Sequence, residues 1–141
     1  MKSKNIFKIF IVAFLISNVF VNIKVYQSST LTGYLLYDFN NDSYLVPYEI
    51  YNKLDDNFPN LTQTALPIKY LKARYLLNID SISQAKSLLY DASKANPYIM
   101  APESMLSDIY LKENNLDSAY ILSKLAFNKM PNVDFHRNTY F

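Results

Sequence analysis

Two segments of this chain, residues 82–97 and 116–131, place small and apolar side chains at the same positions, 34 residues apart. The first reads ISQAKSLLYDASKANP and the second LDSAYILSKLAFNKMP. The matched side chains follow an i, i+3, i+7, i+10 spacing, which indicates one buried face of a helix. They are Ile82, Ala85, Leu89 and Ala92 in the first segment, and Leu116, Ala119, Ser123 and Ala126 in the second. A period of this length predicts stacked two-helix units.

The recurring alanines and prolines have separate physical roles in this pattern. Alanine lets two helices approach to roughly 8–10 Å, where a larger side chain would push them apart. Pro97 and Pro131 end each unit because proline cannot continue a helix. Tight turns are expected at residues 80–81 and 114–115, since Asp and Asn tolerate left-handed backbone geometry. Ser81 or Asn115 can then cap the helix that follows.

Residues 66–131 resemble the tetratricopeptide repeat (TPR) family. In the second unit, Leu106 and Tyr110 stand at the large apolar positions of the first helix, with Ser107 at the small position between them, while Glu103 replaces the usual tryptophan. The first unit keeps the small residue at Ala73 but has lysines where tryptophan and leucine are expected. Its apolar series is Ile68, Leu71, Tyr75 and Ile79. The resemblance implies an all-α fold, with a short solenoid of antiparallel helix pairs.

Residues 26–65 are expected to be helical, and one interpretation makes them a degenerate third unit. In that interpretation DFNNDS is the turn between its helices, and Tyr44, Tyr48, Tyr51 and Leu54 form the buried face of the second helix. Pro47 departs from the pattern because it occupies the place of the small alanine. The alternative is an irregular tyrosine-rich region that packs against the first repeat. Residues 132–141 form a short terminal segment that caps the array, belongs to a longer protein, or meets a partner.

Residues 1–25 form a membrane anchor or signal segment. Residues 9–23 carry no charge and follow a lysine-rich start, and the apolar stretch 6–23 approaches the roughly 17–25 residues that span a bilayer core. An uncleaved anchor is favoured because no small-x-small cleavage site follows it. The basic residues before the span place the rest of the chain on the extracytoplasmic side of the inner (cytoplasmic) membrane, as a single-pass protein. A buried core helix is the alternative, but this small domain could not cover it on all sides.

Composition excludes several classes of function. The chain has no cysteine and a single glycine, Gly33, so it offers no thiol nucleophile, sulfur-rich metal site or phosphate-binding loop. Beyond residue 24 it carries ten basic and twelve acidic residues, so it lacks the excess of basic side chains typical of a nucleic-acid-binding protein. His136 is interpreted as a terminal-loop histidine without a special role, and the adjacent Asp55 and Asp56 would point to different faces. We expect no catalysis, cofactor or metal.

The TPR resemblance places a binding groove along the first helices of the units. It assigns Tyr70, Arg74, Leu77 and Asn78 from one unit, and Ser104, Asp108, Leu111 and Lys112 from the next. Arg74 and Lys112 would bind an acidic segment of a protein or peptide partner. The alternative is that these two side chains are solvated surface residues, one of them paired with Asp108.

The sequence therefore predicts a membrane-tethered, non-enzymatic TPR-like module for protein–protein interaction or scaffolding, with oligomerisation possible. The alternative is the C-terminal portion of a larger polytopic membrane protein, similar in layout to the O-antigen ligase or polymerase type. A soluble protein released by signal cleavage is a third possibility.

Overall fold

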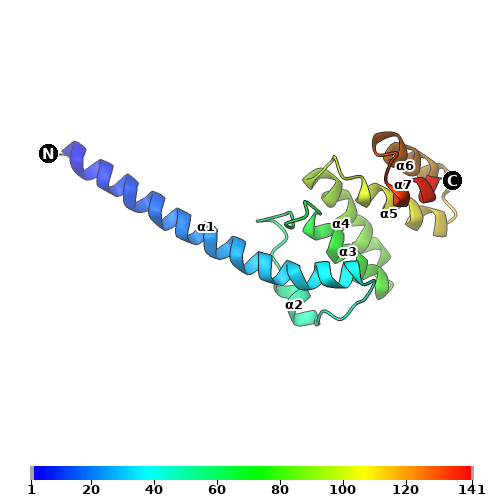
Figure 1. Ribbon diagram of the computed structural model, residues 1–141, viewed down its shortest axis with the longest axis horizontal. Helices are drawn as coiled ribbons and strands as arrows, with labels where there is room; N and C mark the ends of the chain where they lie inside the picture. Colours follow the sequence, from blue (N-terminus) through cyan, green and yellow to red (C-terminus); the bar gives the residue numbers. More distant parts are fainter. Residues whose placement is uncertain (1, 141) are drawn as a thin grey trace.

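The computed structural model describes residues 2–140, and within that range every named element is a helix. Figure 1 shows a long amino-terminal helix that projects from a group of shorter ones. The elements are α1 (Lys2–Asn40), α2 (Tyr48–Lys53), α3 (Ile68–Asn78), α4 (Ile82–Ala95), α5 (Ala101–Lys112), α6 (Leu116–Lys129) and α7 (Asp134–Tyr140). The all-α prediction is confirmed.

Helix α1 is long and apolar enough to cross a membrane. Its 39 residues extend over about 59 Å at 1.5 Å per residue. The large apolar side chains from Ile6 to Ile23 are exposed. The amides of Asn18 and Asn22 each donate to a backbone carbonyl one turn earlier, at 2.8 Å, which satisfies these polar groups within the helix. No break occurs near residue 25, so the apolar stretch passes directly into the helix that joins the domain.

The end of α1 is fixed to α3 through a buried carboxylate. Asp38 accepts hydrogen bonds from the Tyr75 hydroxyl, from Ser43 Oγ at 2.7 Å and from the Val46 backbone N–H at 2.8 Å. Burial alone would raise the pKa of Asp38, but these hydrogen bonds outweigh it and hold the pKa below its ordinary value. The long helix and the domain are therefore joined through an ionised carboxylate that accepts three hydrogen bonds.

The helices α3–α4 and α5–α6 pack as two hairpins, and α4 packs against α5 between them. The matched alanines Ala85, Ala92, Ala119 and Ala126 are all buried, as their spacing predicts. The backbone at Asp80 and Asn114 is left-handed, with φ of 56° and 59°, so both expected turns are confirmed. Asn115 caps α6 by accepting from the Ser118 N–H, whereas Ser81 makes no side-chain cap bond.

Three apolar side chains expected on buried faces are exposed instead. Ile82 and Leu116 are the first residues of α4 and α6, and Ile79 follows the last residue of α3. Each stands at a helix end, and a side chain there has fewer neighbours to cover it than one in the middle of a helix. The expectation that these residues complete the buried faces is therefore wrong.

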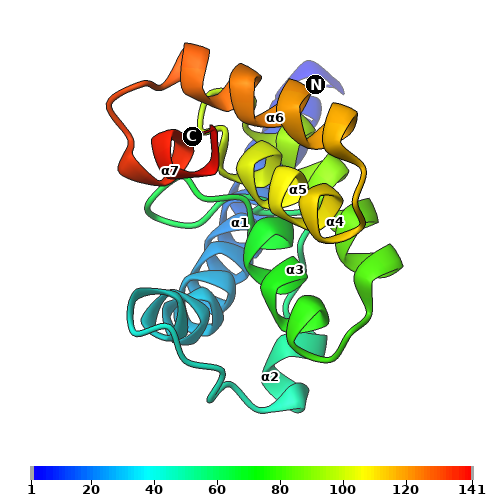
Figure 2. The same ribbon diagram turned by 90° about the vertical axis from the view of Figure 1, so that its right-hand side faces the viewer.

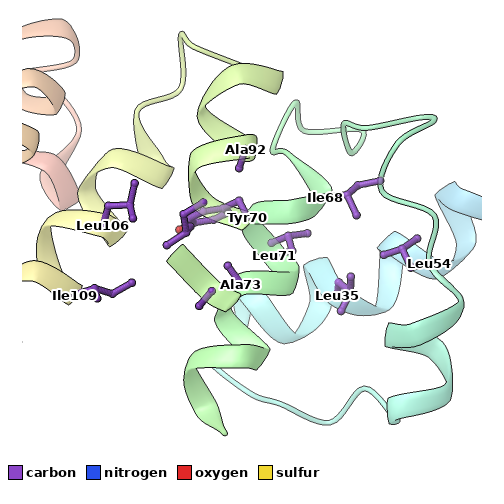
Figure 3. Packing of buried hydrophobic residues seen from close by; sticks show 11 residues of the cluster. Leu35, Leu54, Ile68, Tyr70, Leu71, Ala73, Ala92, Leu106 and Ile109 are labelled. Carbon is purple, nitrogen blue, oxygen red and sulfur yellow. The ribbon is translucent and has the colours of Figure 1, made fainter. Parts of the chain in front are cut away.

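The core is continuous from α1 to α5. Leu35 of α1 and Leu54, which follows α2, gather around Ile68 and Leu71 of α3 (Figure 3). Leu89 of α4 and Leu106 and Ile109 of α5 extend the same cluster. The domain end of α1 is therefore part of the domain core.

The expected third unit has a different form from the repeat pattern. A turn at Asn41–Asp42 ends α1 within DFNNDS, but α2 has only six residues and an irregular loop follows it. Leu54 is buried, whereas Tyr44 is 40% exposed, and the side chain of Tyr48 lies outside the described part of the chain. A proline at the start of α2 cannot supply the small side chain on which close helix packing depends.

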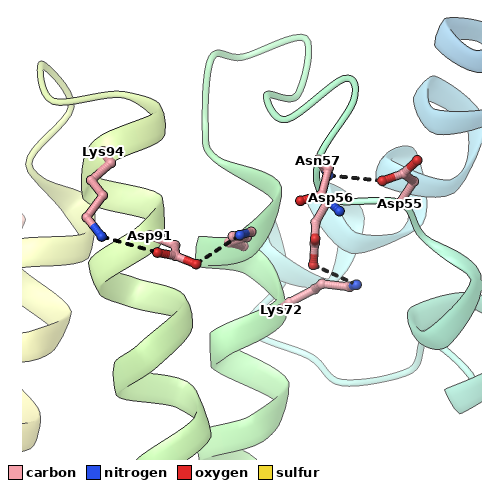
Figure 4. A network of polar contacts seen from close by, with 7 residues as sticks. Asp55, Asp56, Asn57, Lys72, Asp91 and Lys94 are labelled. Atoms are coloured by element: carbon pink, nitrogen blue, oxygen red, sulfur yellow. Dashed lines mark hydrogen bonds and ion pairs between the residues drawn. The ribbon is translucent and has the colours of Figure 1, made fainter.

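Ion pairs attach the loop after α2 to the helices. Lys72 of α3 contacts Asp56 at 2.9 Å, and Lys24 of α1 contacts Asp55 at 3.3 Å. Lys69 and Lys94 bind Asp91 of α4 beside them (Figure 4). The ion pairs of Lys24 and Lys72 hold Asp55 and Asp56 against α1 and α3, and the Lys69–Asp91 pair joins α3 to α4.

Residues 134–140 form helix α7 and not the loop expected around His136. Helix α7 packs against α5 and α6 (Figure 2). His136 is buried at 2% exposure, so the interpretation of this side chain as a terminal-loop residue is wrong.

Candidate binding groove

Two pockets lie along α3 and α5, and Met105 lines both of them. The first has a volume of about 580 Å³ and the second about 320 Å³. We call this surface the α3–α5 groove. Its first pocket is lined by Phe39, Asp42, Tyr70, Arg74, Ile99, Ala101, Met105, Met130, Val133 and His136. Its second pocket is lined by Leu77, Asp80, Ile82, Met105, Asp108, Ile109, Lys112 and Glu113.

Arg74 is the cation of the first pocket, and aromatic rings position it. Its side chain is only 10% exposed, and its guanidinium lies 5.0 Å from the Phe39 ring centre and 5.2 Å from that of Tyr44. One guanidinium nitrogen donates to Asp42 Oδ1 at 2.9 Å. The Asp42 side chain is 92% exposed, so a buried cation is paired with a carboxylate that water surrounds.

Tyr70 forms the apolar floor beside Arg74. It is almost fully buried and makes an edge-to-face contact with Phe39 at 6.0 Å between ring centres. Burial raises its pKa to about 12, so the hydroxyl stays neutral at physiological pH.

His136 forms part of the opposite wall of the first pocket. Its Nε2 lies 3.3 Å from the Ile99 carbonyl oxygen, which can only accept, so Nε2 carries the proton. Its Nδ1 then accepts from Ser104 Oγ at 2.6 Å. Burial lowers the pKa of His136, and this arrangement satisfies both nitrogens of a neutral imidazole. Nearby, Glu103 Oε2 is buried without a hydrogen-bond partner.

The second pocket is lined by three acidic side chains, Asp80, Asp108 and Glu113, and by one basic side chain, Lys112. Burial raises the pKa of Asp108, and the positive charge of Lys112 acts in the opposite direction. Glu113 at the same pocket is already paired with Lys86 of α4 at 2.9 Å. The second pocket therefore offers mixed charge, whereas the first offers an apolar surface beside one ion pair, Arg74 with Asp42.

The eight groove candidates from the sequence lie in different places. Leu77 lines the second pocket, whereas Leu111 is exposed and lines neither pocket. Tyr70 and Arg74 line the first pocket, and Asp108 and Lys112 line the second. Ser104 is fully buried and meets the groove only through His136. Asn78 is exposed near the end of α3 and lines neither pocket.

Sequence reasoning missed the walls of the first pocket. Phe39 comes from the end of α1 and Asp42 from the turn after it, Met130 follows the last residue of α6, and Val133 and His136 come from the terminal segment. The only signal was a histidine in an otherwise ordinary terminal segment. Apart from Met130, these residues lie outside the period of 34, so the repeat pattern says nothing about their position.

Comparison with protein-family models, with curated protein sequences and with solved structures finds no match. Among the described residues, no three His, Asp or Glu side chains gather in an arrangement that could hold a metal ion. An apolar pocket with one buried guanidinium suits a ligand that combines an apolar side chain with a carboxylate.

Proposed function

We propose that the chain is a membrane-tethered protein-interaction module whose TPR-like units bind a segment of a partner protein in the α3–α5 groove. In this proposal helix α1 is an anchor in the cytoplasmic membrane, and the basic residues before the span support an extracytoplasmic position of the helical domain. The proposed role is binding and scaffolding, without catalysis. The hairpin pairs, the buried alanines and the left-handed turns at Asp80 and Asn114 support the TPR-like interpretation.

The pairing of Arg74 with Asp42 is the observation that carries the proposal. Aromatic rings hold the guanidinium in a largely apolar pocket, and its intramolecular carboxylate is exposed and makes one contact at 2.9 Å. A guanidinium can bind a carboxylate through two parallel hydrogen bonds, which is stronger than this single contact. A partner carboxylate would therefore replace Asp42.

The volume beside Arg74 indicates the rest of the ligand. Tyr70, Ile99, Ala101, Met105, Met130 and Val133 make the pocket mainly apolar. Methionine side chains adapt to different shapes, so the pocket tolerates more than one large aliphatic or aromatic group. The expected ligand is an extended peptide with a large apolar residue next to an acidic side chain or a terminal carboxylate.

A random peptide library panned against the full chain in dodecyl maltoside micelles tests this function. We expect selected peptides to share an apolar residue adjacent to a carboxylate. Asp42→Asn removes the internal competitor, an ion pair of ~0.2–1 kcal/mol, and should raise peptide affinity by up to about fivefold. Arg74→Gln removes a charge-assisted bond and should weaken affinity by about 10- to 150-fold.

Lys94→Gln is the matched control, because this side chain is 79% exposed on α4 and lies outside the groove. Its affinity should equal that of the unaltered chain. The Asp42→Asn and Arg74→Gln substitutions are expected to change peptide affinity in opposite directions. Loss of folding cannot produce that result. Peptides without an acidic preference, or equal affinities for all three variants, would refute the proposal.

A further inference from the structure

One face of α1 stays uncovered after the helix leaves the apolar stretch. Between residues 26 and 40, the side chains that meet the domain are Ser28, Ser29, Leu31, Thr32, Leu35, Leu36, Asp38 and Phe39. The opposite face carries Tyr26, Thr30, Gly33 and Tyr37, which are exposed. Tyr26 and Tyr37 are 75% and 61% exposed, a large aromatic surface for a helix in water.

The exposed face continues a regular pattern that begins inside the apolar stretch. Its members lie alternately three and four residues apart, which is the heptad spacing of two helices packed side by side. We call this set the α1 seam: Ile9, Val12, Ile16, Val19, Ile23, Tyr26, Thr30, Gly33 and Tyr37. Every seam position from 9 to 23 is Ile or Val, whereas the phenylalanines of this stretch lie off the seam. Side chains branched at Cβ have restricted rotamers and lose little freedom when packed.

Gly33 provides a second, independent observation. It lies in the interior of α1, where glycine lowers helix stability relative to alanine. A Cβ added at this position would meet no atom within 4 Å, so the fold of the single chain gives no reason for glycine. Small residues at a helix interface permit close approach of another backbone.

We propose that the α1 seam is the interface of a parallel homodimer. Two copies inserted in the same direction present the same seam in the same register, so each residue faces its counterpart across a twofold axis. The seam carries no charge, so like charges do not meet at its centre. Gly33 lies opposite Gly33 just beyond the bilayer, where the two helices come closest.

This arrangement places the two helical domains on the outer sides of the helix pair. The domain contacts α1 through the face opposite the seam, so pairing along the seam requires no displacement of the domain. Both α3–α5 grooves stay open, because Phe39 and Asp42 border the groove from the domain side of the helix end. A dimer therefore presents two grooves to a partner, and tethering raises the effective concentration for the second contact.

Disulfide mapping in the full chain tests the dimer, since the protein has no cysteine of its own. Single cysteines are placed on the seam at Ile16, Ile23, Tyr26, Gly33 and Tyr37, and each variant is reconstituted in vesicles of phosphatidylethanolamine and phosphatidylglycerol. Phe14→Cys, Val21→Cys and Val25→Cys are the matched controls, because these exposed residues lie on α1 off the seam. Seam positions should cross-link about fivefold more than the controls, because a disulfide needs Cβ atoms ~3.5–4.5 Å apart.

A second variant separates dimerisation from folding. Gly33→Leu should raise the dimer dissociation constant by about tenfold, while helix content stays equal or increases, because leucine favours helix more than glycine does. Equal cross-linking at seam and control positions would overturn the proposal, as would yields that peak on another face or stop after Ile23. An unchanged dissociation constant for Gly33→Leu would also overturn it. Peptide binding by the groove is a separate measurement and can fail or succeed independently.

Discussion

Replacement of Ala92 by leucine tests whether the small side chains are required for helix packing. Ala92 is fully buried on α4, which packs against both α3 and α5, and Figure 3 shows it at the core cluster. If space were available, three added carbons would stabilise the fold by about 0.8 kcal/mol each, or about 2.4 kcal/mol. If the helices are already in close contact, the larger side chain costs ~1–3 kcal/mol. The two cases differ in sign, and we predict destabilisation.

Urea unfolding of the full chain in dodecyl maltoside micelles, followed by near-ultraviolet circular dichroism of the tyrosines, measures the change. Ser87→Leu is the control, because Ser87 is exposed on the same helix and its substitution should change stability by less than about 0.5 kcal/mol. Ala126 is also fully buried and lies 34 residues after Ala92, so Ala126→Leu should have the same sign. An Ala92→Leu chain as stable as the unaltered protein, or more stable, would refute the close-packing argument.

Three further predictions concern single contacts. Tyr75→Phe removes the hydrogen bond to the buried Asp38 carboxylate and should lower the free energy of unfolding by ~1.5–3 kcal/mol in the same urea assay. Burial lowers the pKa of His136 from 6.5, so below pH 6.5 the unfolded chain binds a proton that the folded chain does not. Stability should therefore be retained above pH 6.5 and fall below it by up to about 1.4 kcal/mol per pH unit, a slope that His136→Gln removes. Asn114→Ala places alanine at φ 59° and should cost about 1 kcal/mol by thermal unfolding.

Each of these predictions has a control on the same chain. Tyr98→Phe removes a hydroxyl from a side chain that is 82% exposed and should leave stability unchanged. Asn128→Ala changes an exposed position inside α6, where alanine favours helix and should not destabilise. If Asn114→Ala is as harmless as Asn128→Ala, the left-handed turn does not limit stability. A His136→Gln chain that keeps the slope between pH 6.5 and 5 would assign that slope to another group.

The features that sequence predicted are those set by neighbouring residues. The spacing of the alanines indicates one face of a helix, because helical geometry depends only on neighbouring residues. Ala85 and Ala119 are buried accordingly. Asp80 and Asn114 were predictable because few residues accept left-handed geometry at a tight turn. The apolar stretch at the amino end is recognisable for the same reason, since its length and composition are properties of one segment.

The features that sequence missed depend on which distant segments meet. Ile82 and Leu116 fit the helical spacing, but the spacing does not show that a residue at the end of a helix lacks neighbours to cover it. Helix before the DFNNDS turn was expected, but its unbroken continuation from the apolar stretch, as one helix from Lys2 to Asn40, was not. The first pocket of the groove joins Phe39 to His136, two residues almost one hundred positions apart. No periodicity within the chain connects them.

Photo-cross-linking of a selected acidic peptide tests the proposed binding face most directly. A benzophenone amino acid replaces Met105 at the centre of the α3–α5 groove, and in separate chains it replaces the exposed Tyr120 or Ile121 of α6. The peptide carries an isotope label, and adducts are located by mass spectrometry in the full chain in micelles. Adducts from Met105 that free peptide suppresses, with none from α6, are the predicted result. Adducts from α6, or none from Met105 under conditions where the peptide is bound, would contradict the account.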